Sequence, residues 1–285
     1  MTAASSTGAS PAYLRPRDLD EAVAARAAHP DWMVLAGGTD LMVNANHRPI
    51  PAGILDLWRL PALGFVRFAD GAIAIGAGTT WLEVSRHPAI CAHAAPLAAA
   101  AREIGALQIQ ARGTLGGNVA TSSPVGDSLP VLLALDAELE LASVRGHRRV
   151  PYHAFCTGYR TTQLAPDELI VAAHIAIPGP ATRTAWRKVG TRRAQSISKV
   201  MAAAAITLDG DVVIDARVAL GAVADRPIRI PAVEAAVRGL PLREAGDAAR
   251  AALRTAIRPI DDIRSTASYR QEVAENLVAR FFAAG

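Results

Sequence analysis

A glycine-rich stretch at residues 112–127, RGTLGGNVATSSPVGD, constrains the fold of this chain most strongly. Gly116 and Gly117 are adjacent, and such a pair lets the backbone adopt positive φ and turn consecutive N–H groups towards one point. We expect an anionic group such as a phosphate at that point. Further hydrogen-bond donors stand around the pair: Thr114, Asn118 and Thr121. Asp127 comes just before the apolar run 129–135, where a carboxylate would cap a helix or accept hydrogen bonds from a ligand.

A second glycine pair lies in residues 35–41, LAGGTDL. The apolar run 33–36 predicts a buried strand before the pair, and residues 40–46 predict a helix after it. A glycine turn that leads into a helix N-terminus binds anions. Two such loops fit the two phosphates of a dinucleotide better than they fit a mononucleotide. The alternative is that both loops are surface turns without a ligand, because turn geometry alone selects these residue types.

The common nucleotide-binding motifs are absent from the sequence. Gly76 and Gly78 begin a G-x-G pattern, but Trp81 occupies the place of the third glycine. No G-x-x-x-x-G-K-[ST] motif occurs. The Rossmann and P-loop folds are therefore disfavoured as the source of nucleotide binding.

Composition limits the other kinds of site. The net charge of +4 is too small to indicate nucleic-acid binding. The two cysteines, Cys91 and Cys156, cannot supply the four thiolates of an iron–sulfur cluster, and without C-x-x-C or H-E-x-x-H we expect no metal site. So few cysteines favour a reducing compartment, here the cytoplasm. We predict a disordered tail rather than a signal peptide at residues 1–10, and no apolar run reaches the roughly 18 residues of a membrane span.

Hydrophobic periodicity and turn residues predict two domains. The run Pro178-Gly179-Pro180 can continue neither a strand nor a helix and marks the boundary. Before it we expect helices at 22–28, 80–85, 96–105 and 129–135, and strands at 33–36, 54–57, 72–75, 138–144, 148–150 and 169–177. After it we expect strands at 182–189, 201–208 and 212–221, and helices at 232–238, 245–257 and 269–282. Capping boxes are expected to begin at Asp18 and Thr80, and Asp209-Gly210 predicts a hairpin. Four apolar residues of the last helix share one face and predict core packing: Val273, Leu277, Val278 and Phe281.

Several of these segments together resemble one protein family. They are AGGTDL (36–41), IGAGTT (75–80), RGTLGGNVATSSPVGD (112–127), GYRTTQLAPDELI (158–170), RKVGTRR (187–193) and DDIRSTASYR (261–270). The chain resembles the FAD-binding subunit of molybdenum hydroxylases, the group that includes xanthine dehydrogenase, carbon monoxide dehydrogenase and aldehyde oxidase. The resemblance implies an α+β fold with a PCMH-type FAD-binding domain of two α/β subdomains at 11–178. A C-terminal domain like that of the CO dehydrogenase flavoprotein, with an antiparallel sheet and helices, would follow at 181–285.

The resemblance also implies the residues that bind FAD, and it implies no catalytic residue and no metal ligand in this chain. The expected FAD-binding residues are Leu35, Ala36, Gly37, Gly38, Thr39, Asp40, Leu41, Ile104, Thr114, Gly116, Gly117, Asn118, Thr121, Asp127, Ile170 and Lys188. Lys188 would approach FAD and neutralise either phosphate or reduced flavin; the alternative is a solvated strand edge. Tyr159 and Arg160 belong to a segment that approaches the flavin or a neighbouring subunit in relatives. Ala111 stands where the family often has Asn, and we leave it out of the site.

The resemblance implies an electron-transfer role. FAD would take electrons from a [2Fe–2S] small subunit and pass them to NAD or another acceptor, while a molybdopterin large subunit hydroxylates the substrate. A dimer of heterotrimers is the expected assembly, and residues 261–270 are expected to be structural. Two alternatives stay open: a stand-alone FAD-dependent oxidase or reductase, and a non-catalytic nucleotide-binding scaffold.

Overall fold

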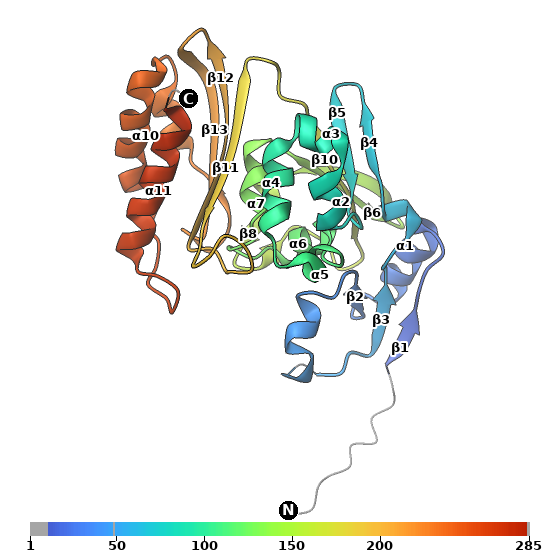
Figure 1. Cartoon of the computed structure of the whole chain (residues 1–285). Helices are drawn as coiled ribbons and strands as arrows, with labels where there is room; N and C mark the ends of the chain where they lie inside the picture. The colour runs from blue at the N-terminus through green and yellow to red at the C-terminus, as the bar shows by residue number, and fades with distance from the viewer. Residues whose placement is uncertain (1–10, 48, 284–285) are drawn as a thin grey trace, which may run out of the picture.

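The computed structural model describes residues 11–47 and 49–283, so the predicted tail at 1–10 lies outside the described residues. Figure 1 shows a small N-terminal lobe, a central lobe, and a C-terminal sheet that is backed by long helices. This arrangement confirms the predicted α+β class. No helix in the described part of the chain is long and apolar enough to cross a membrane.

The N-terminal lobe is a parallel sheet with the strand order β1-β3-β2 and one helix. Its elements are β1 (Ala12–Leu14), α1 (Leu19–Ala28), β2 (Met33–Leu35), the 3₁₀ helix η1 (Leu41–His47) and β3 (Gly53–Asp56). Asp18 caps α1 by accepting a hydrogen bond from the Glu21 backbone N–H, but Glu21 itself accepts from the N–H of Arg17, so only half of the predicted box forms. The strand predicted at 33–36 forms as β2, but its predicted burial is wrong, because β2 is a short edge strand and is only half-buried.

The central lobe contains a five-stranded antiparallel sheet with the order β4-β5-β10-β6-β7. Its strands are β4 (Val66–Ala69), β5 (Ala72–Gly76), β6 (Glu138–Ser143), β7 (Gly146–Pro151) and β10 (Leu169–Ala176). Its helices include α2 (Trp81–Arg86), α3 (Pro88–His93), α4 (Ala95–Glu103) and α7 (Leu129–Ala134). The capping box that begins α2 is complete, as predicted, with Thr80 and Glu83 bonded to each other's backbone N–H groups.

Several short elements of this lobe differ from the prediction or were not predicted. They are η2 (Pro61–Leu63), α5 (Leu107–Gln110), α6 (Leu115–Thr121), α8 (Tyr152–Phe155), β8 (Cys156–Gly158) and β9 (Thr161–Thr162). The most important is α6, because it contains the glycine pair that we expected in an open turn. The segment 41–47 likewise forms the 3₁₀ helix η1 where an α-helix was expected.

The C-terminal part is a four-stranded antiparallel sheet with three helices on one face. Its elements are β11 (Thr182–Val189), β12 (Val200–Asp209), β13 (Val212–Gly221), β14 (Ile228–Arg229), α9 (Pro231–Val237), α10 (Leu242–Ala256) and α11 (Ala267–Phe282). Gly210 has φ +60° in the β12–β13 turn, which agrees with the predicted hairpin. Val273, Leu277, Val278 and Phe281 pack into the core between the helices and the sheet, as predicted.

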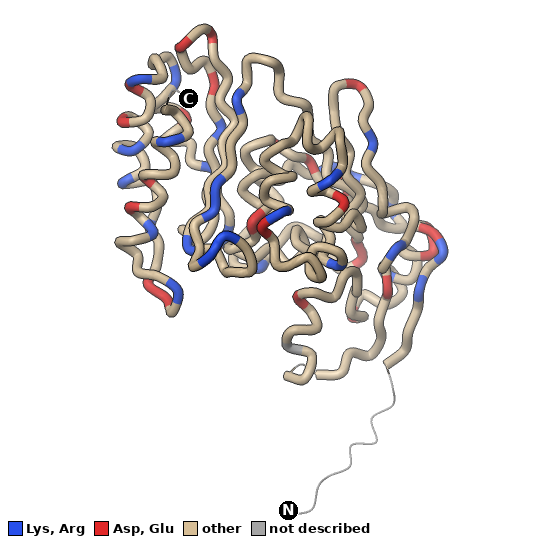
Figure 2. Tube along the Cα trace, in the orientation of Figure 1, with Lys and Arg blue, Asp and Glu red and all other residues tan. Residues whose placement is uncertain are grey.

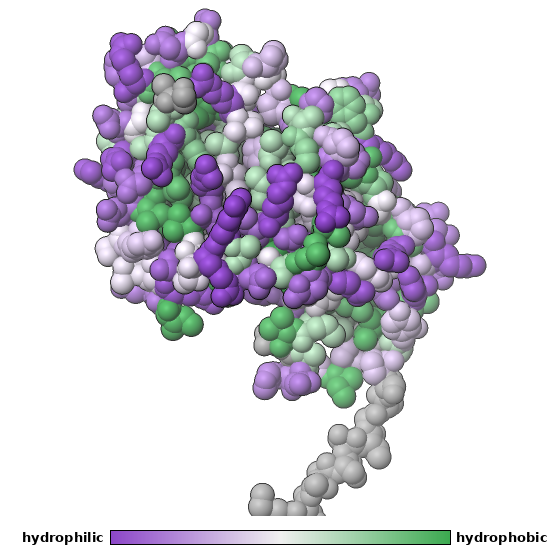
Figure 3. Space-filling view, viewed as in Figure 1, coloured by the Kyte–Doolittle hydropathy of each residue, from purple (hydrophilic) through white to green (hydrophobic). Residues whose placement is uncertain are grey.

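The C-terminal sheet joins two hydrophobic cores. Along β12, Ala202 and Ala204 pack under the C-terminal helices, whereas Ala203 and Ala205 pack against the central lobe, where α4 and α7 face the sheet. This alternation is the period of two that a strand imposes on its side chains. Figure 2 shows Lys and Arg gathered along β11 and the turn after it, and Figure 3 shows a mostly polar face with small hydrophobic patches.

Candidate functional site

A cleft of about 590 Å³ lies where the two glycine-rich segments meet. It is lined by the loop 36–41 that leads into η1, by α6 and by residues near the beginning of β10. The structure brings together thirteen of the predicted site residues on its walls: Ala36, Gly37, Gly38, Thr39, Asp40, Leu41, Ile104, Thr114, Gly116, Gly117, Asn118, Thr121 and Ile170. Leu35, Asp127 and Lys188 do not line it.

The first glycine loop offers the open backbone donors of this cleft. Within the described ranges, no protein group accepts a hydrogen bond from the N–H groups of Gly37, Gly38, Thr39 or Asp40. Gly38 has φ +76°, a conformation that favours glycine. Unpaired backbone N–H groups at a cleft wall are suited to a phosphate, which accepts several hydrogen bonds at once.

Gly37 has a different reason to be glycine. A Cβ atom at this position would overlap the carbonyl group of Arg112, so the two glycine-rich segments touch through their backbones. The Arg112 Nε donates to the Gly37 oxygen at 3.4 Å, and its guanidinium lies 3.9 Å from the centre of the Trp58 ring. These contacts hold the first loop against the second.

The second glycine pair does not form the positive-φ turn that we predicted. Gly116 and Gly117 lie in the first turn of α6, and Thr114 caps that helix by accepting from the Gly117 N–H at 3.1 Å. The N–H groups of Leu115 and Gly116 donate to the oxygens of Thr79 and Ala77. The expected amide concavity is therefore closed here, because its donors already bond within the protein.

The two glycines of α6 instead have different roles. Gly116 allows close packing, and Gly117 leaves the cleft wall open to a ligand. A Cβ on Gly116 would come within 2.6 Å of the Ala77 Cβ, so this glycine lets the helix pack closely against the end of β5. Gly117 is exposed at the cleft wall, where a Cβ would meet only the Thr114 hydroxyl at 3.0 Å. Beside it, the Asn118 Oδ1 accepts from Ser128 at 2.7 Å, which leaves the Asn118 NH₂ group as a donor.

Asp127 lies behind the cleft wall in a buried ion pair. Its Oδ2 is 2.5 Å from the Lys188 Nζ, and its Oδ1 accepts from the Ser198 hydroxyl at 2.6 Å. Burial raises the pKa of Asp127, and the charge of Lys188 opposes that shift. The prediction that Asp127 caps a helix is wrong, since Ser128 is the N-cap of α7.

The ion pair with Asp127 also fixes the position of Lys188. Its side chain is 2% exposed, and its Nζ also donates to the Glu103 oxygen at 3.4 Å. The alternative of a solvated strand edge is therefore wrong for this residue. The neighbours Gly126 and Ile104 do line the cleft, so the ion pair supports the wall from behind. A direct contact of Asp127 or Lys188 with FAD stays a prediction.

The cleft also contains residues that we did not predict individually: Arg26, Val34, Leu57, Leu63, Ala77, Gly78, Trp81, Ile109, Gly113, Ala120, Ser123, Val125, Gly126, Arg160, Leu164, Glu168 and Leu169. Many fall within the segments 75–80, 112–127 and 158–170 that carry the family resemblance. Arg160, which has φ +51°, reaches across to Asp40 of the first loop with 3.7 Å between the Arg160 NH1 and the Asp40 Oδ2.

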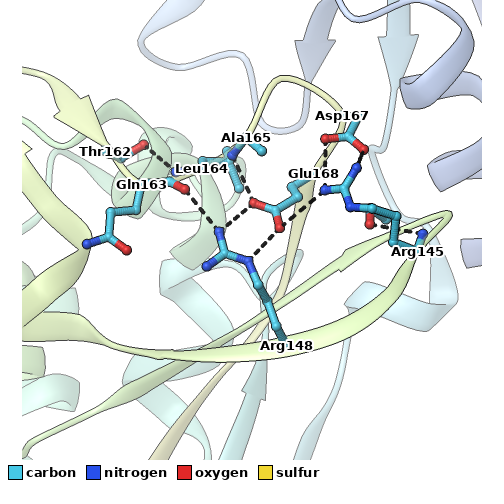
Figure 4. Close-up of polar contacts among 9 residues, drawn as sticks. Arg145, Arg148, Thr162, Gln163, Leu164, Ala165, Asp167 and Glu168 are labelled. Atoms are coloured by element: carbon cyan, nitrogen blue, oxygen red, sulfur yellow. Dashed lines mark hydrogen bonds and ion pairs between the residues drawn. The ribbon is translucent and has the colours of Figure 1, made fainter.

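Glu168 anchors the segment that forms this side of the cleft, as Figure 4 shows. Its carboxylate accepts two hydrogen bonds from Arg148, at 2.6 and 2.7 Å, and one from the Ala165 N–H at 2.8 Å. The hydrogen bonds from Arg148 hold the pKa of Glu168 below its ordinary value. Arg145 pairs with Asp167 on the outer side.

The titratable residues of the cleft are few. Among the described residues that line it, they are Arg26, Asp40, Arg160 and Glu168, and both carboxylates are paired with arginines. No group of three His, Cys, Asp or Glu in the described part of the chain is arranged to hold a metal ion. The cleft is suited to hold a ligand, and its described lining residues include no histidine, cysteine or lysine for acid–base chemistry.

Comparisons with known proteins agree with this description of the fold. Residues 5–180 match the family described as the FAD binding domain in molybdopterin dehydrogenase, and residues 185–284 match the CO dehydrogenase flavoprotein C-terminal domain. The nicotinate dehydrogenase FAD-subunit of Eubacterium barkeri is 30% identical over 95% of this chain and 94% of its own length. A putative xanthine dehydrogenase FAD-binding subunit of Escherichia coli is 35% identical over 81% of this chain and 80% of its own length.

Solved structures show the same likeness. A chain of the carbon monoxide dehydrogenase from Hydrogenophaga pseudoflava superposes with a TM-score of 0.91 at 30% identity. The alignment covers 95% of this chain and 96% of that chain. The likeness therefore spans both the central lobe with its cleft and the C-terminal sheet.

Proposed function

Because this chain belongs to the family of FAD-binding subunits of molybdenum hydroxylases, we propose that it carries electrons between an iron–sulfur partner and a final acceptor. It is an oxidoreductase subunit, and its cofactor is FAD. Bound FAD supplies reversible one-electron and two-electron chemistry. The residues of this chain bind and orient the cofactor and control access to it.

The residues of the cleft fit FAD. The free N–H groups of Gly37–Asp40 would hold phosphate oxygens, and the Asn118 NH₂ group and the Thr121 hydroxyl add donors from α6. Apolar side chains on the walls suit a flat aromatic ring system: Leu57, Leu63, Ile104, Ile109 and Ile170.

One observation carries the proposal: the cleft combines open backbone donors with paired carboxylates. Glu168 accepts hydrogen bonds from Arg148, and Asp40 forms a more exposed ion pair with Arg160 at 3.7 Å. Such a cleft suits a bound cofactor that supplies the redox chemistry itself. Substrate chemistry therefore belongs to another subunit in this proposal.

We propose the rest of the assembly from the relatives. The similar protein from Hydrogenophaga pseudoflava is named a medium chain, and another relative is named a subunit of a dehydrogenase complex. By analogy, a [2Fe–2S] small subunit would deliver electrons, and a molybdopterin large subunit would oxidise the substrate. NAD or another acceptor would receive the electrons, in a cytoplasmic dimer of heterotrimers.

Purification of the native complex through a tag on this chain tests the proposal. The expected preparation contains FAD, iron, molybdenum and two further polypeptides in constant ratio. FAD without metals or further chains would instead support a stand-alone flavoenzyme. A preparation without a flavin spectrum that dithionite bleaches would indicate a nucleotide-binding scaffold.

A further inference from the structure

An arginine of the N-terminal lobe has a buried donor without an acceptor. Arg26 lies in the last turn of α1 and lines the cleft. Its NH1 donates to the Trp32 oxygen at 3.0 Å, but its Nε is buried and has no hydrogen-bond partner among the residues that the structure describes. A buried donor that stays unpaired lowers stability, so this atom indicates a missing acceptor.

The charge of the guanidinium is also unmatched. In the described part of the chain, no acidic side chain is hydrogen-bonded to Arg26. The carboxylates whose charges act on it are Asp31 and Asp167, and Asp167 is bonded to Arg145. Burial lowers the pKa of Arg26, yet an arginine stays charged in a protein. A ligand in the cleft is therefore the acceptor that this side chain can reach.

The position of Arg26 decides which part of FAD it meets. The Trp32 oxygen that it bonds comes directly before β2, and the open N–H groups of residues 37–40 follow that strand. Val34, within β2, lines the cleft as well. At about 3.3 Å per residue, β2 separates the guanidinium from these phosphate donors by roughly 10–15 Å. The group beside Arg26 is therefore one of the two ring systems of FAD and not the phosphates.

Burial distinguishes the two ring systems. The core in which α1 packs supplies three leucines of the cleft wall, and all three are buried: Leu57, Leu63 and Leu169. On α6, by contrast, the lining residues Gly117 and Ala120 are exposed. A flavin ring that exchanges electrons with other proteins needs the open part of the cleft. The enclosed part is left for the adenine ring, which takes no part in electron transfer.

We propose that Arg26 binds the adenine ring of FAD at the enclosed end of the cleft. The inference rests on the proposed function and gives a cofactor-binding role to a residue outside the glycine-rich segments. Adenine has ring nitrogens that accept hydrogen bonds, and such an acceptor is what the Arg26 Nε lacks. The leucines around it suit a flat neutral base, and a single charged donor fixes its orientation.

The test measures the two halves of the cofactor separately. ADP carries the adenine, FMN carries the flavin, and the Kd of each is measured by calorimetry on the full-length chain freed of FAD. We expect Arg26→Gln to raise the Kd for ADP about tenfold to a hundredfold and to leave the Kd for FMN unchanged. Arg15→Gln is the matched control, because Arg15 donates to the Trp58 oxygen at 3.2 Å in the same lobe but does not line the cleft. It should change neither Kd.

A second variant separates binding from folding. Arg26→Lys keeps the charge and a donor for the Trp32 oxygen but lacks the other donors of the guanidinium. It should keep a melting temperature near that of the FAD-free wild type and still weaken ADP binding, with FMN binding unchanged.

Different outcomes overturn different statements. Equal Kd values for ADP in the wild type and both Arg26 variants would overturn the role of Arg26. A rise for FMN instead of ADP would show that the flavin lies at this end and would overturn the adenine assignment. An equal rise for both fragments would reduce Arg26 to a structural residue. A wild-type chain that binds neither FAD nor either fragment would overturn the proposed function as well.

Discussion

The two adjacent glycines of α6 have separate roles, and substitution should separate them. Gly116→Val would force a side chain into the Ala77 Cβ and should unfold the central lobe or lower its stability by about 1–3 kcal/mol through overpacking. Gly117→Val adds its methyl groups at the exposed cleft wall. It should abolish stoichiometric FAD and leave the melting temperature near that of the FAD-free wild-type protein. Calorimetry and the flavin absorbance of the purified variants measure the two effects.

A matched control is Gly179→Ala, because a Cβ there meets no atom within 4 Å and Gly179 has no positive φ. Gly179→Ala should change neither the melting temperature nor the FAD content. A folded Gly117→Val protein that keeps one FAD per chain would show that the cofactor does not lie against this wall.

Removing the charge of either partner in the Asp127–Lys188 pair should lower the free energy of unfolding. Asp127→Asn leaves the Lys188 ammonium buried without a counter-charge, and we expect a loss of about 3–5 kcal/mol in the free energy of unfolding. The double variant Asp127→Asn with Lys188→Met should recover part of that loss, because no unpaired charge remains. Urea unfolding of both single variants and the double variant gives the coupling energy. Additive effects would show that the two side chains do not act as a pair.

The pH dependence of Lys188→Met follows from the direction of the Asp127 shift. Burial raises the pKa of Asp127, and removal of Lys188 takes away the charge that opposes this rise. The folded protein then binds a proton more readily than the unfolded chain, so its stability falls as pH rises through the folded pKa. Lys188→Met should therefore be closest to wild type in acid and most destabilised at neutral pH. Urea titrations at several pH values would reveal the opposite trend if Asp127 stayed ionised.

At the scale of elements, the segment 159–168 depends on one buried carboxylate. Glu168→Gln removes the charge that two Arg148 hydrogen bonds require, and we expect a loss of about 1.5–3 kcal/mol. Asp167→Asn is the control, since its partner Arg145 is 60% exposed and such pairs contribute at most about 1 kcal/mol. Chemical denaturation of the two variants measures both losses in the free energy of unfolding. Equal losses in the two variants would contradict the role of Glu168 as the anchor.

The same carboxylate should make this segment sensitive to acid. The pKa of Glu168 is lowered in the folded protein, so its contribution is complete above the unfolded pKa of about 4.3 and is lost as pH falls through the folded pKa. As the pH falls over that range, the free energy of unfolding of Glu168→Gln should therefore decrease less than that of wild type. Hydrogen exchange of the 159–168 backbone is the local measurement.

Strong periodicity made the long elements predictable. The bounds of β13 agree with the prediction, and those of α10 and α11 agree within a few residues, because apolar residues recur on one face over several turns or strand pairs. The helix α6 was not predictable in this way. Glycine is a poor helix former, and α6 forms because Thr114 caps it and Ala77 packs against Gly116.

The site was predictable where its residues lie together in sequence and not where they come from distant segments. Residues 36–41 line the cleft as a continuous run, and the motif identifies them. The partner of Asp127 is 61 residues away, so no local pattern shows that its carboxylate faces Lys188 instead of a helix terminus. Arg160 reaches Asp40 only through the folding of the central lobe onto the N-terminal one.

At the scale of the whole molecule, the C-terminal sheet supports the wall of the cleft from behind. Its inner face packs on α4 and α7, and Trp186 of β11 donates its indole N–H to the Asp127 oxygen at 3.1 Å. The predicted boundary at 178–180 lies between β10 and β11, and independent folding of the two parts stays a prediction.

The isolated chain should be redox-active but unable to oxidise the substrate of its complex. Its cleft has donors for FAD, whereas its two carboxylates are paired, and the sequence has two cysteines where one iron–sulfur cluster needs four thiolates. The purified chain should bind FAD and transfer electrons from NADH to a dye if NAD is its acceptor. Oxidation of purines, aldehydes or carbon monoxide should require both partner subunits. A reconstitution series that omits each subunit in turn measures this dependence. Substrate oxidation by this chain alone would show that it is a complete flavoenzyme and would exclude a purely electron-transferring role.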